Sequence, residues 1–306
     1  MPGYLLRRLV QSVLILIGVS IITFLILFAL PADPARQVAG RTASAEQVQQ
    51  VRHQLGLDLP LPAQYWRYVT HLAQGDLGRS YVQRSQVSEL IASRLPASLL
   101  LMLGAIFCEL LIGLTSGAFA AFRRNTPMDQ GVMVGALLFV STPQFLVAYI
   151  LLYVFGAWLG WLPMSGYGEF KNLVLPAITL GLLGGGWYAR MMRSSIIEVL
   201  RQDYVRTARA KGLSRARIVL IHVVPNGLLP IIAMVGLDIG YFMSGIVVVE
   251  SVFGWPGIGQ LTWQAIQQID IPIIMGVTLV AACAIVLGNL LADLMAPLID
   301  PRIKLK

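Results

Sequence analysis

Charged residues are scarce in this chain of 306 residues. Only 12% of the residues are Asp, Glu, Lys or Arg, whereas 57% are hydrophobic and the mean hydropathy is +0.73. A water-soluble domain of this size would have more charged and fewer apolar residues, so the composition excludes a soluble globular fold. The composition predicts an all-α polytopic membrane protein.

Cysteine and histidine are scarce as well. Cys108 and Cys283 lie inside apolar runs, where we interpret them as small buried residues rather than as a disulfide or a metal site. The three histidines are scattered and lack the spacing of metal ligands. We therefore expect neither a metal site nor a cofactor.

Motifs for catalysis are missing. The sequence has no Gly-x-x-x-x-Gly-Lys-Ser/Thr phosphate-binding loop, and no Ser, His and Asp set can be nominated, so we expect no catalytic residue. Three consecutive glycines at 184–186 suit close helix packing better than phosphate binding. The net charge of +8 does not indicate nucleic acid, because the charges cluster at the ends of apolar spans.

Six apolar segments are long enough to cross a bilayer, which takes about 20 helical residues. The first is too long for the apolar core of a signal peptide, roughly 7–15 residues. The third is interrupted at residues 141–144, and the fourth is weakened by Pro176 and the three glycines. The predicted spans are Leu9–Leu30, Ala97–Phe122, Gln130–Leu159, Asn172–Met192, Asn226–Val249 and Ile271–Leu298.

One long polar segment separates the first span from the others. Within it, a helix is predicted from Ser44 to Leu55 with Gly56 ending it, a second from Tyr65 to Leu72, and a turn at residues 75–80. The chain therefore divides into residues 1–30 with the first span, an external loop region at 31–96, a core of five spans at 97–298 and a cytoplasmic tail at 299–306.

Positive charges orient the spans. With a cytoplasmic N-terminus, 15 of the 23 Lys and Arg residues fall on the cytoplasmic side, and eight of these lie between Arg190 and Arg217. Because cytoplasmic segments carry the excess of Lys and Arg, both termini are predicted to be cytoplasmic and the 31–96 loop to be external.

The most basic segment, residues 203–225, lies between two apolar spans. A helix can run to Lys211, and Gly212 suits the left-handed position that ends it. Ser214 can cap a second short helix, which Pro225 is expected to stop. Such an elbow would dock a soluble partner on the cytoplasmic side. The predicted contact residues are Ala208, Arg209, Ala210, Lys211, Gly212, Leu213, Ser214 and Pro225.

This elbow resembles the Glu-Ala-Ala loop of ABC importer permeases, in which Gly follows after three residues and a closing Pro ends the motif. Ala208 takes the place of the second Ala, Gly212 that of the Gly and Pro225 that of the Pro. The version Thr-Ala-Arg-Ala-Lys-Gly is similar to the dipeptide, oligopeptide and nickel branch. The departures from the general pattern are Arg206, Thr207 and His222.

A second motif of the same family follows the fifth span. It reads Glu-x-x-Phe-x-Trp-Pro-Gly-x-Gly, and an Asp-x-Pro comes later. Trp-Pro-Gly predicts a rigid outer turn with its aromatic rings at the bilayer interface, followed by a short helix at Ile258–Ile269. The residues of this predicted outer turn are Glu250, Phe253, Trp255, Pro256, Gly257, Gly259, Asp270 and Pro272.

Ionisable residues inside the spans are few. Asp238 lies near the middle of the fifth span, where it either lines a translocation path or only joins helices through a hydrogen bond. For Glu109 we favour a structural role. The predicted path residues are Asp238, Ser141, Thr142 and Gln144.

The resemblance covers the chain from Arg7 to Arg302 and implies the transmembrane-domain fold of a type I ABC importer with six helices, in the lipid of the bacterial inner membrane. It implies a second homologous permease subunit, two ABC ATPase subunits and an external substrate-binding protein as partners. Di- and oligopeptides are the expected cargo, with nickel, metal chelates or glutathione as the alternative. An ion-coupled carrier or channel is the alternative from another class, although no internal repeat supports it.

Overall fold

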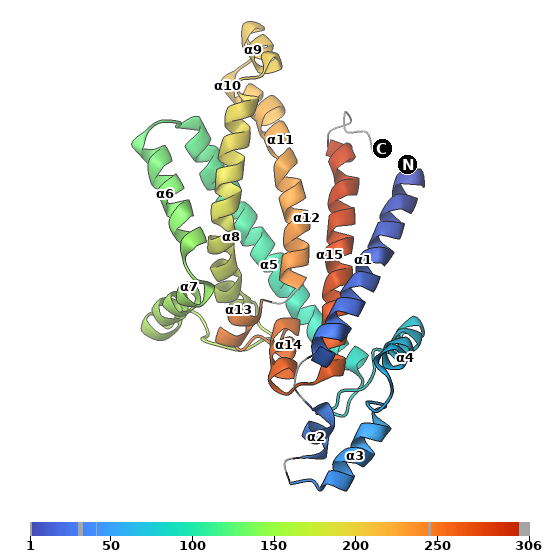
Figure 1. Cartoon of the computed structure of the whole chain (residues 1–306). Coiled ribbons are helices and arrows are strands. Elements are labelled where there is room, and N and C mark those ends of the chain that lie inside the picture. Colours follow the sequence, from blue (N-terminus) through green and yellow to red (C-terminus); the bar gives the residue numbers. More distant parts are fainter. Residues whose placement is uncertain (1, 30–32, 41, 244–245, 300–306) are drawn as a thin grey trace. The chain divides into compact units, whose positions relative to one another are not determined.

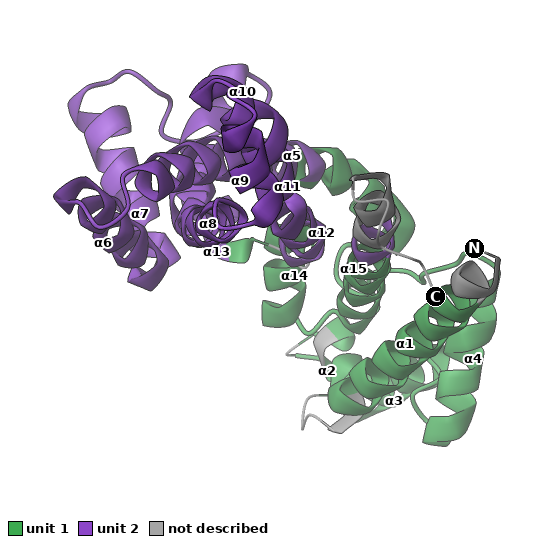
Figure 2. Ribbon diagram, turned by 90° about the horizontal axis from the view of Figure 1, so that it is seen from above, with its two compact units in different colours: residues 1–98, 243–247, 256–286 green, residues 99–242, 248–255, 287–306 purple. Residues whose placement is uncertain are grey.

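The computed structural model describes residues 2–29, 33–40, 42–243 and 246–299 (Figure 1). Apart from one isolated bridge between Arg79 and Gln86, regular structure in this described part is helical, which confirms the all-α class. Most of the predicted tail, residues 300–306, lies outside it. The chain divides into two compact units, shown in Figure 2: unit 1 comprises residues 1–98, 243–247 and 256–286, and unit 2 comprises residues 99–242, 248–255 and 287–306.

Four described helices are long and apolar enough to cross a membrane: α1 (Pro2–Ala29), α5 (Val87–Phe122), α8 (Phe170–Val199) and α15 (Ile271–Ile299). Two bent helix pairs are long and apolar enough to cross when the two helices of each pair are taken together. In the first, α6 (Pro127–Ser141) is followed by α7 (Gln144–Leu151) and its π-helical continuation η1 (Leu152–Trp158), with a bend of 105°. In the second, the helix from Arg215 to Gly227 bends by 41° before α12 (Leu229–Met243). Counting each pair as one span gives six crossings.

Short helices complete both units. In unit 1, Ser44 and Gln47 form a capping box at the start of α3, and Gly56 follows that helix with a φ of +67°, as the sequence predicts. Unit 1 contains α2 (Pro34–Ala39), α3 (Ala45–Gln54), α4 (Leu61–Ala73) and α14 (Ile258–Gln267). Unit 2 contains α9 (Asp203–Ala210), α10 (Arg215–Ile218), η2 (Val219–Val223), α11 (Val224–Gly227) and most of α13 (Val247–Val252).

Glycines set the close packing of α8 in unit 2. A Cβ atom added at Gly113 of α5 would overlap the Cβ atom of Tyr188 on α8. One added at Gly186 would lie 2.5 Å from the carbonyl oxygen of Ala136 on α6, and one at Gly185 would lie 3.0 Å from Ile112 of α5. Small residues let helices approach in a membrane, so the prediction that residues 184–186 serve helix packing is confirmed.

Several predicted helix boundaries are wrong. The fifth predicted span, Asn226–Val249, corresponds to α12, which covers only Leu229–Met243. The second spanning helix begins at Val87 rather than Ala97, and Pro96 lies inside it. The fourth runs from Phe170 to Val199 through Pro176 and the three glycines without a break. Proline is tolerated inside membrane helices because neighbouring helices satisfy the freed backbone groups, so local propensity underestimates their length.

The helix after Ser214 does not stop at Pro225, contrary to the prediction. It continues through η2 and α11 to Gly227, and Pro225, which has no N–H to donate, follows shortly after the π-helical turn. The buried residues Ile218, Val223, Gly227 and Ile231 are spaced by five, four and four positions. The π-helical turn of η2 supplies the extra residue that keeps them on one face.

Candidate functional site

The basic elbow, residues 203–225, begins beyond the end of α8 in unit 2, and its last part, in α11, packs against α8 (Figure 1). Gly212 has a φ of +74°, and its N–H donates to the carbonyl oxygen of Arg209 at 3.0 Å. Ser214 caps α10 by accepting a hydrogen bond from the N–H of Arg217 at 3.4 Å. The predicted helix–glycine–helix geometry is therefore confirmed.

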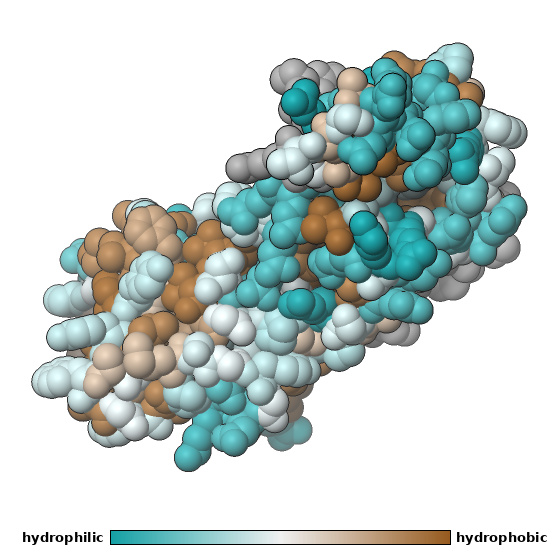
Figure 3. Space-filling view, turned by 90° about the horizontal axis from the view of Figure 1, so that it is seen from below, coloured by the Kyte–Doolittle hydropathy of each residue, from teal (hydrophilic) through white to brown (hydrophobic). Residues whose placement is uncertain are grey.

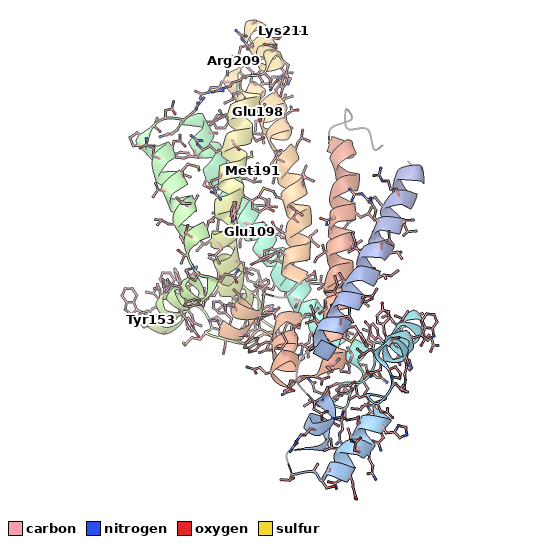
Figure 4. The ribbon with its side chains drawn as sticks, in the orientation of Figure 1. Glu109, Tyr153, Met191, Glu198, Arg209 and Lys211 are labelled. Carbon is pink, nitrogen blue, oxygen red and sulfur yellow. The ribbon has the colours of Figure 1, made fainter. Side chains whose placement is uncertain are left out.

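The elbow has a buried face and a basic face. Val205 and Ala208 of α9 are buried together with Ile218 of α10, in a core that includes residues of α8. Arg209 and Lys211 are exposed, and Figure 4 shows them at the tip of the elbow, beyond α8. A short element that is anchored on one side and charged on the other can bind a separate protein without unfolding.

An ion pair joins α6 to α8 near the start of the elbow. Arg193 donates from Nε and Nη2 to the two carboxylate oxygens of Asp129, at 2.6 and 2.7 Å. The N–H of Asn125 adds a third hydrogen bond to this carboxylate at 3.0 Å. Because the Asp129 residue is only 2% exposed, this two-pronged pair is shielded from water and fixes α6 against α8.

Asp238 lies on α12 among the packed helices of unit 2. Its carboxylate accepts a hydrogen bond from the Tyr188 hydroxyl and also pairs with the Glu109 side chain. Glu109 is 4% exposed, and its Oε2 atom has no hydrogen-bond partner in the described part of the chain. The two side chains therefore place acceptor oxygens among the helices of unit 2.

Residues 141–144 form the break between α6 and α7. Gln144, the first residue of α7, donates from Nε2 to the Tyr241 hydroxyl at 2.8 Å, so it contacts α12, the helix that carries Asp238. Thr142 donates to the carbonyl oxygen of Leu138 in its own helix at 2.6 Å, and Ser141 is exposed. The structure thus brings Gln144, but not Thr142, into contact with α12.

The aromatic residues of the predicted outer turn are core residues, which corrects the expectation that they lie at the bilayer interface. Trp255 is 1% exposed and packs edge-on against Tyr167, with ring centroids 5.0 Å apart. Phe253 is also buried, and its carbonyl oxygen accepts a hydrogen bond from the N–H of Gly166 at 3.2 Å. Glu250 is buried at the end of α13, and its carbonyl oxygen accepts from the Trp255 N–H at 2.8 Å. These contacts make the part of the motif from Glu250 to Trp255 a rigid, buried turn.

The second half of this motif lies in unit 1. Pro256 and Gly257 lead into α14, where Gly259 is buried. Pro272 begins α15 beside Gly78, since a Cβ atom added at Gly78 would lie 3.8 Å from the Pro272 side chain. The outer motif therefore reaches the external loop region.

Asp270 is the centre of this connection. Its fully buried carboxylate accepts hydrogen bonds from the Ser80 hydroxyl at 2.5 Å, the Tyr81 N–H at 3.2 Å and the Val82 N–H at 3.1 Å. Burial, and next the Asp270 charge, raise the pKa of Tyr81 to about 12. Asp270 thus fixes the turn at residues 80–82.

The whole chain matches a described family. The model of the binding-protein-dependent transport system inner membrane component matches residues 113–305, and the model of its N-terminal part matches residues 1–102. The chain belongs to this family. It is therefore an inner-membrane permease subunit of an ABC importer of the peptide and nickel branch, as its elbow and outer motif suggest.

Individual relatives agree along the full length. Proteins named glutathione transport system permease protein GsiC are 41% identical in Salmonella paratyphi A and 39% identical in Escherichia coli K12, over 306 residues and all of both chains. An inward-facing structure of the MetNI methionine ABC transporter has a TM-score of 0.58 at 18% identity, covering 69% of this chain and 97% of that chain. At this identity the likeness shows the ABC transporter membrane fold.

Membership in this family assigns the chain to the membrane part of the importer. ATP hydrolysis belongs to other subunits, and a substrate-binding protein delivers the cargo, so both kinds of partner are implied. The alternative of a self-sufficient carrier or channel is thereby set aside.

The hydrogen-bond partners of Asp238 and Asp270 were not predicted from the sequence. Tyr188 cannot be distinguished from an ordinary core aromatic residue, and Ser80 stands in a polar loop that offers many candidates. Sequence reasoning also missed the arginines of the external loop region, which entered only as charges outside the membrane. The charged residues and glycines at positions 75–84 were the sequence feature that could have drawn attention to these arginines.

Proposed function

We propose that this chain is the permease subunit of an importer of glutathione and related short peptides. The observation that carries the proposal is the 41% identity, over the full length of both chains, to a permease named for glutathione transport. This favours the glutathione alternative over the di- and oligopeptide cargo that the motifs first suggested. Glutathione is itself a tripeptide, so the two cargoes share much of their chemistry.

In this proposal the elbow couples the permease to the ATPase subunits. Its buried face holds it to α8, and its exposed basic face, with Arg209 and Lys211, binds the ATPase. Closure of two ATPase subunits around ATP moves the elbow and tilts the helices. The termini and the elbow are cytoplasmic, in keeping with the distribution of Lys and Arg.

The translocation path runs along α12. Asp238, together with Glu109, offers acceptor oxygens to the amino group of a peptide, and Gln144 lies against the same helix. Ser141 and Thr142 belong to the break beside it, where the chain can open without unfolding a long helix. A second homologous permease subunit supplies the other side of the path.

The test is ATP-driven uptake by the reconstituted complex. Vesicles containing this chain, its partner permease, both ATPases and the binding protein should accumulate labelled glutathione only when ATP and binding protein are present. Labelled dialanine and a nickel chelate serve as competing cargoes. Uptake of dialanine with no uptake of glutathione would overturn the choice of cargo, and uptake without ATP would overturn the importer.

The coupling role is tested at Gly212. Gly212→Pro removes the N–H that bonds to Arg209 and forbids a φ of +74°, so uptake should fall at least tenfold while ATP hydrolysis continues. Gly212→Asn is the matched control, because Asn tolerates the left-handed conformation. Normal uptake by the Pro variant would remove the elbow from the mechanism.

A further inference from the structure

Unit 1 holds a cavity of about 980 Å³ within the external loop region. Residues of α3, of α4, of the turn at 76–84 and of the first turn of α15 line it. In Figure 3 the surface over α2–α4 is mainly hydrophilic, in keeping with a position outside the bilayer. Ligand cavities in proteins are typically about 300–1,000 Å³, so a short peptide fits this one.

The charge in the cavity is mainly positive. Arg67, Arg79 and Arg84 all line it, and in the described part of the chain none of the three forms an ion pair with a carboxylate. Asp76 is the acidic residue of the lining. It is already engaged, by His71 Nδ1 at 3.0 Å and by the Gly78 N–H at 2.8 Å. The cavity therefore has an excess of cations.

Two of the arginines have side-chain contacts within unit 1, and the third has an unusual backbone conformation. Arg79 donates from Nε to the carbonyl oxygen of Arg84 at 2.6 Å, which leaves its terminal nitrogens available. Arg84 has a φ of +55°, a left-handed conformation that non-glycine residues adopt only at a cost, and such outliers gather at ligand sites. Arg67 packs over Gly56, because a Cβ atom there would lie 2.7 Å from its Nη1 atom. Guanidinium groups bind carboxylates through two parallel hydrogen bonds, so these three arginines are suited to a ligand with carboxylates.

Neutral groups complete the lining. Gln50 and Gln54 of α3 contribute side-chain amides, and burial raises the pKa of Tyr68 to about 12, so its hydroxyl remains a hydrogen-bond donor. Phe24 and Met275 provide an apolar wall. A ligand with several carboxylates, amide groups and a short aliphatic part matches this set.

We propose that this cavity binds short peptides in which carboxylates outnumber amino groups, at the external side of the permease. The proposal rests on the proposed function, because glutathione has this chemistry: it has two carboxylates, one amino group and a length of at most about 11 Å for three extended residues. The site holds the peptide between its release from the binding protein and its entry into the translocation path.

The test measures binding to the full chain in lipid nanodiscs, without ATPase or binding protein. Labelled glutathione should bind, and trialanine, which has one carboxylate, should bind at least tenfold more weakly. The triple variant Arg67→Gln, Arg79→Gln, Arg84→Gln should lose at least tenfold in affinity for glutathione. Arg36→Gln is the matched control, since Arg36 is an exposed arginine of α2 outside the cavity. Equal melting temperatures of the wild type, the triple variant and the control variant show that each is folded.

Two results would overturn the site. The first is equal glutathione affinity in the triple variant and the wild type. The second is absence of glutathione binding to the wild-type permease in nanodiscs. Failure of ATP-driven glutathione uptake, with binding in nanodiscs intact, would instead contradict the proposed importer while leaving the cavity site in place.

Discussion

The carboxylate of Asp270 accepts a hydrogen bond from the Ser80 hydroxyl at 2.5 Å, although 190 residues separate the two. The contact links the end of the outer motif to a turn of the external loop region. Both residues are buried, so neither can exchange its partner for water without opening the turn. The outer motif therefore has a structural task that its sequence pattern alone did not reveal.

Removing this carboxylate should release the turn. Asp270→Ala leaves the Ser80 hydroxyl and two backbone N–H groups without their acceptor, at about 1–3 kcal/mol for each group that stays buried. We expect limited proteolysis to cut within residues 79–86 much faster than in the wild type. Asp58→Ala, in the same region, is the control, because Asp58 is largely exposed and its nearest partner is His53. Equal cleavage rates in the two variants would show that Asp270 does not hold the turn.

Packing between α5 and α8 should tolerate no added methyl group at Gly113. Gly113→Ala places its Cβ atom into Tyr188 and within 3.0 Å of the Gly185 carbonyl oxygen, and overpacking of this kind costs about 1–3 kcal/mol. Gly135→Ala on α6 is the matched control, since nothing lies within 4 Å of its added Cβ atom. Thermal unfolding in detergent should show a lower Tm for the first variant and an unchanged or higher Tm for the second. The reverse order would contradict the close approach of the helices.

The buried ion pair between Asp129 and Arg193 should contribute more to stability than the exposed ion pair between Asp203 and Arg206 in the elbow. Asp129→Ala leaves Arg193 without its partner, and breaking a buried pair costs about 3–5 kcal/mol, with the lower end expected because Arg193 is 26% exposed. Asp203→Ala breaks the exposed contact to Arg206 at 3.6 Å and should change stability by less than about 1 kcal/mol. Denaturation of the two variants in parallel measures the difference, and similar losses would argue against shielding of Asp129.

The external loop region should lose stability in alkali. The folded state favours the neutral form of Tyr81, whose pKa is raised to about 12, so this contribution is complete below about pH 10 and is lost as the pH rises toward 12. Burial raises the pKa of Tyr68 to about 12 as well. The double variant Tyr68→Phe, Tyr81→Phe should therefore show a flatter dependence of proteolytic resistance on pH between 9 and 12. A curve as steep as that of the wild type would assign the alkaline loss to other groups.

Much of the fold and part of the candidate site could be predicted from the sequence. Long apolar runs indicate spanning helices, and local rules placed Gly212, Ser214 and Gly56 correctly, because caps and left-handed turns depend on adjacent residues. The burial of Trp255 could not be predicted, because the ring of Tyr167 that covers it comes from a distant loop.

The contacts of Asp238 and of the arginines in the external loop region could not be predicted from the sequence either. Each of these contacts joins segments that meet only in the folded chain, so the spacing of residues along the sequence does not predict it. Family resemblance supplied the elbow and the outer motif as units, whereas the hydrogen bonds of Asp270 within unit 1 required coordinates.

The extra residue in the π-helical turn η2 determines in which direction around the helix axis α9 and α10 project. Each residue of an α-helix turns the chain by about 100°, so deletion of one residue from Val219–Val223 would convert the wide turn into a regular one and swing the elbow around the helix axis by roughly that amount. The basic face would then point in a new direction although every residue of α9 and α10 remained. The direction in which α9 and α10 project is thus set by one extra residue near the end of the elbow, between Gly212 and Pro225.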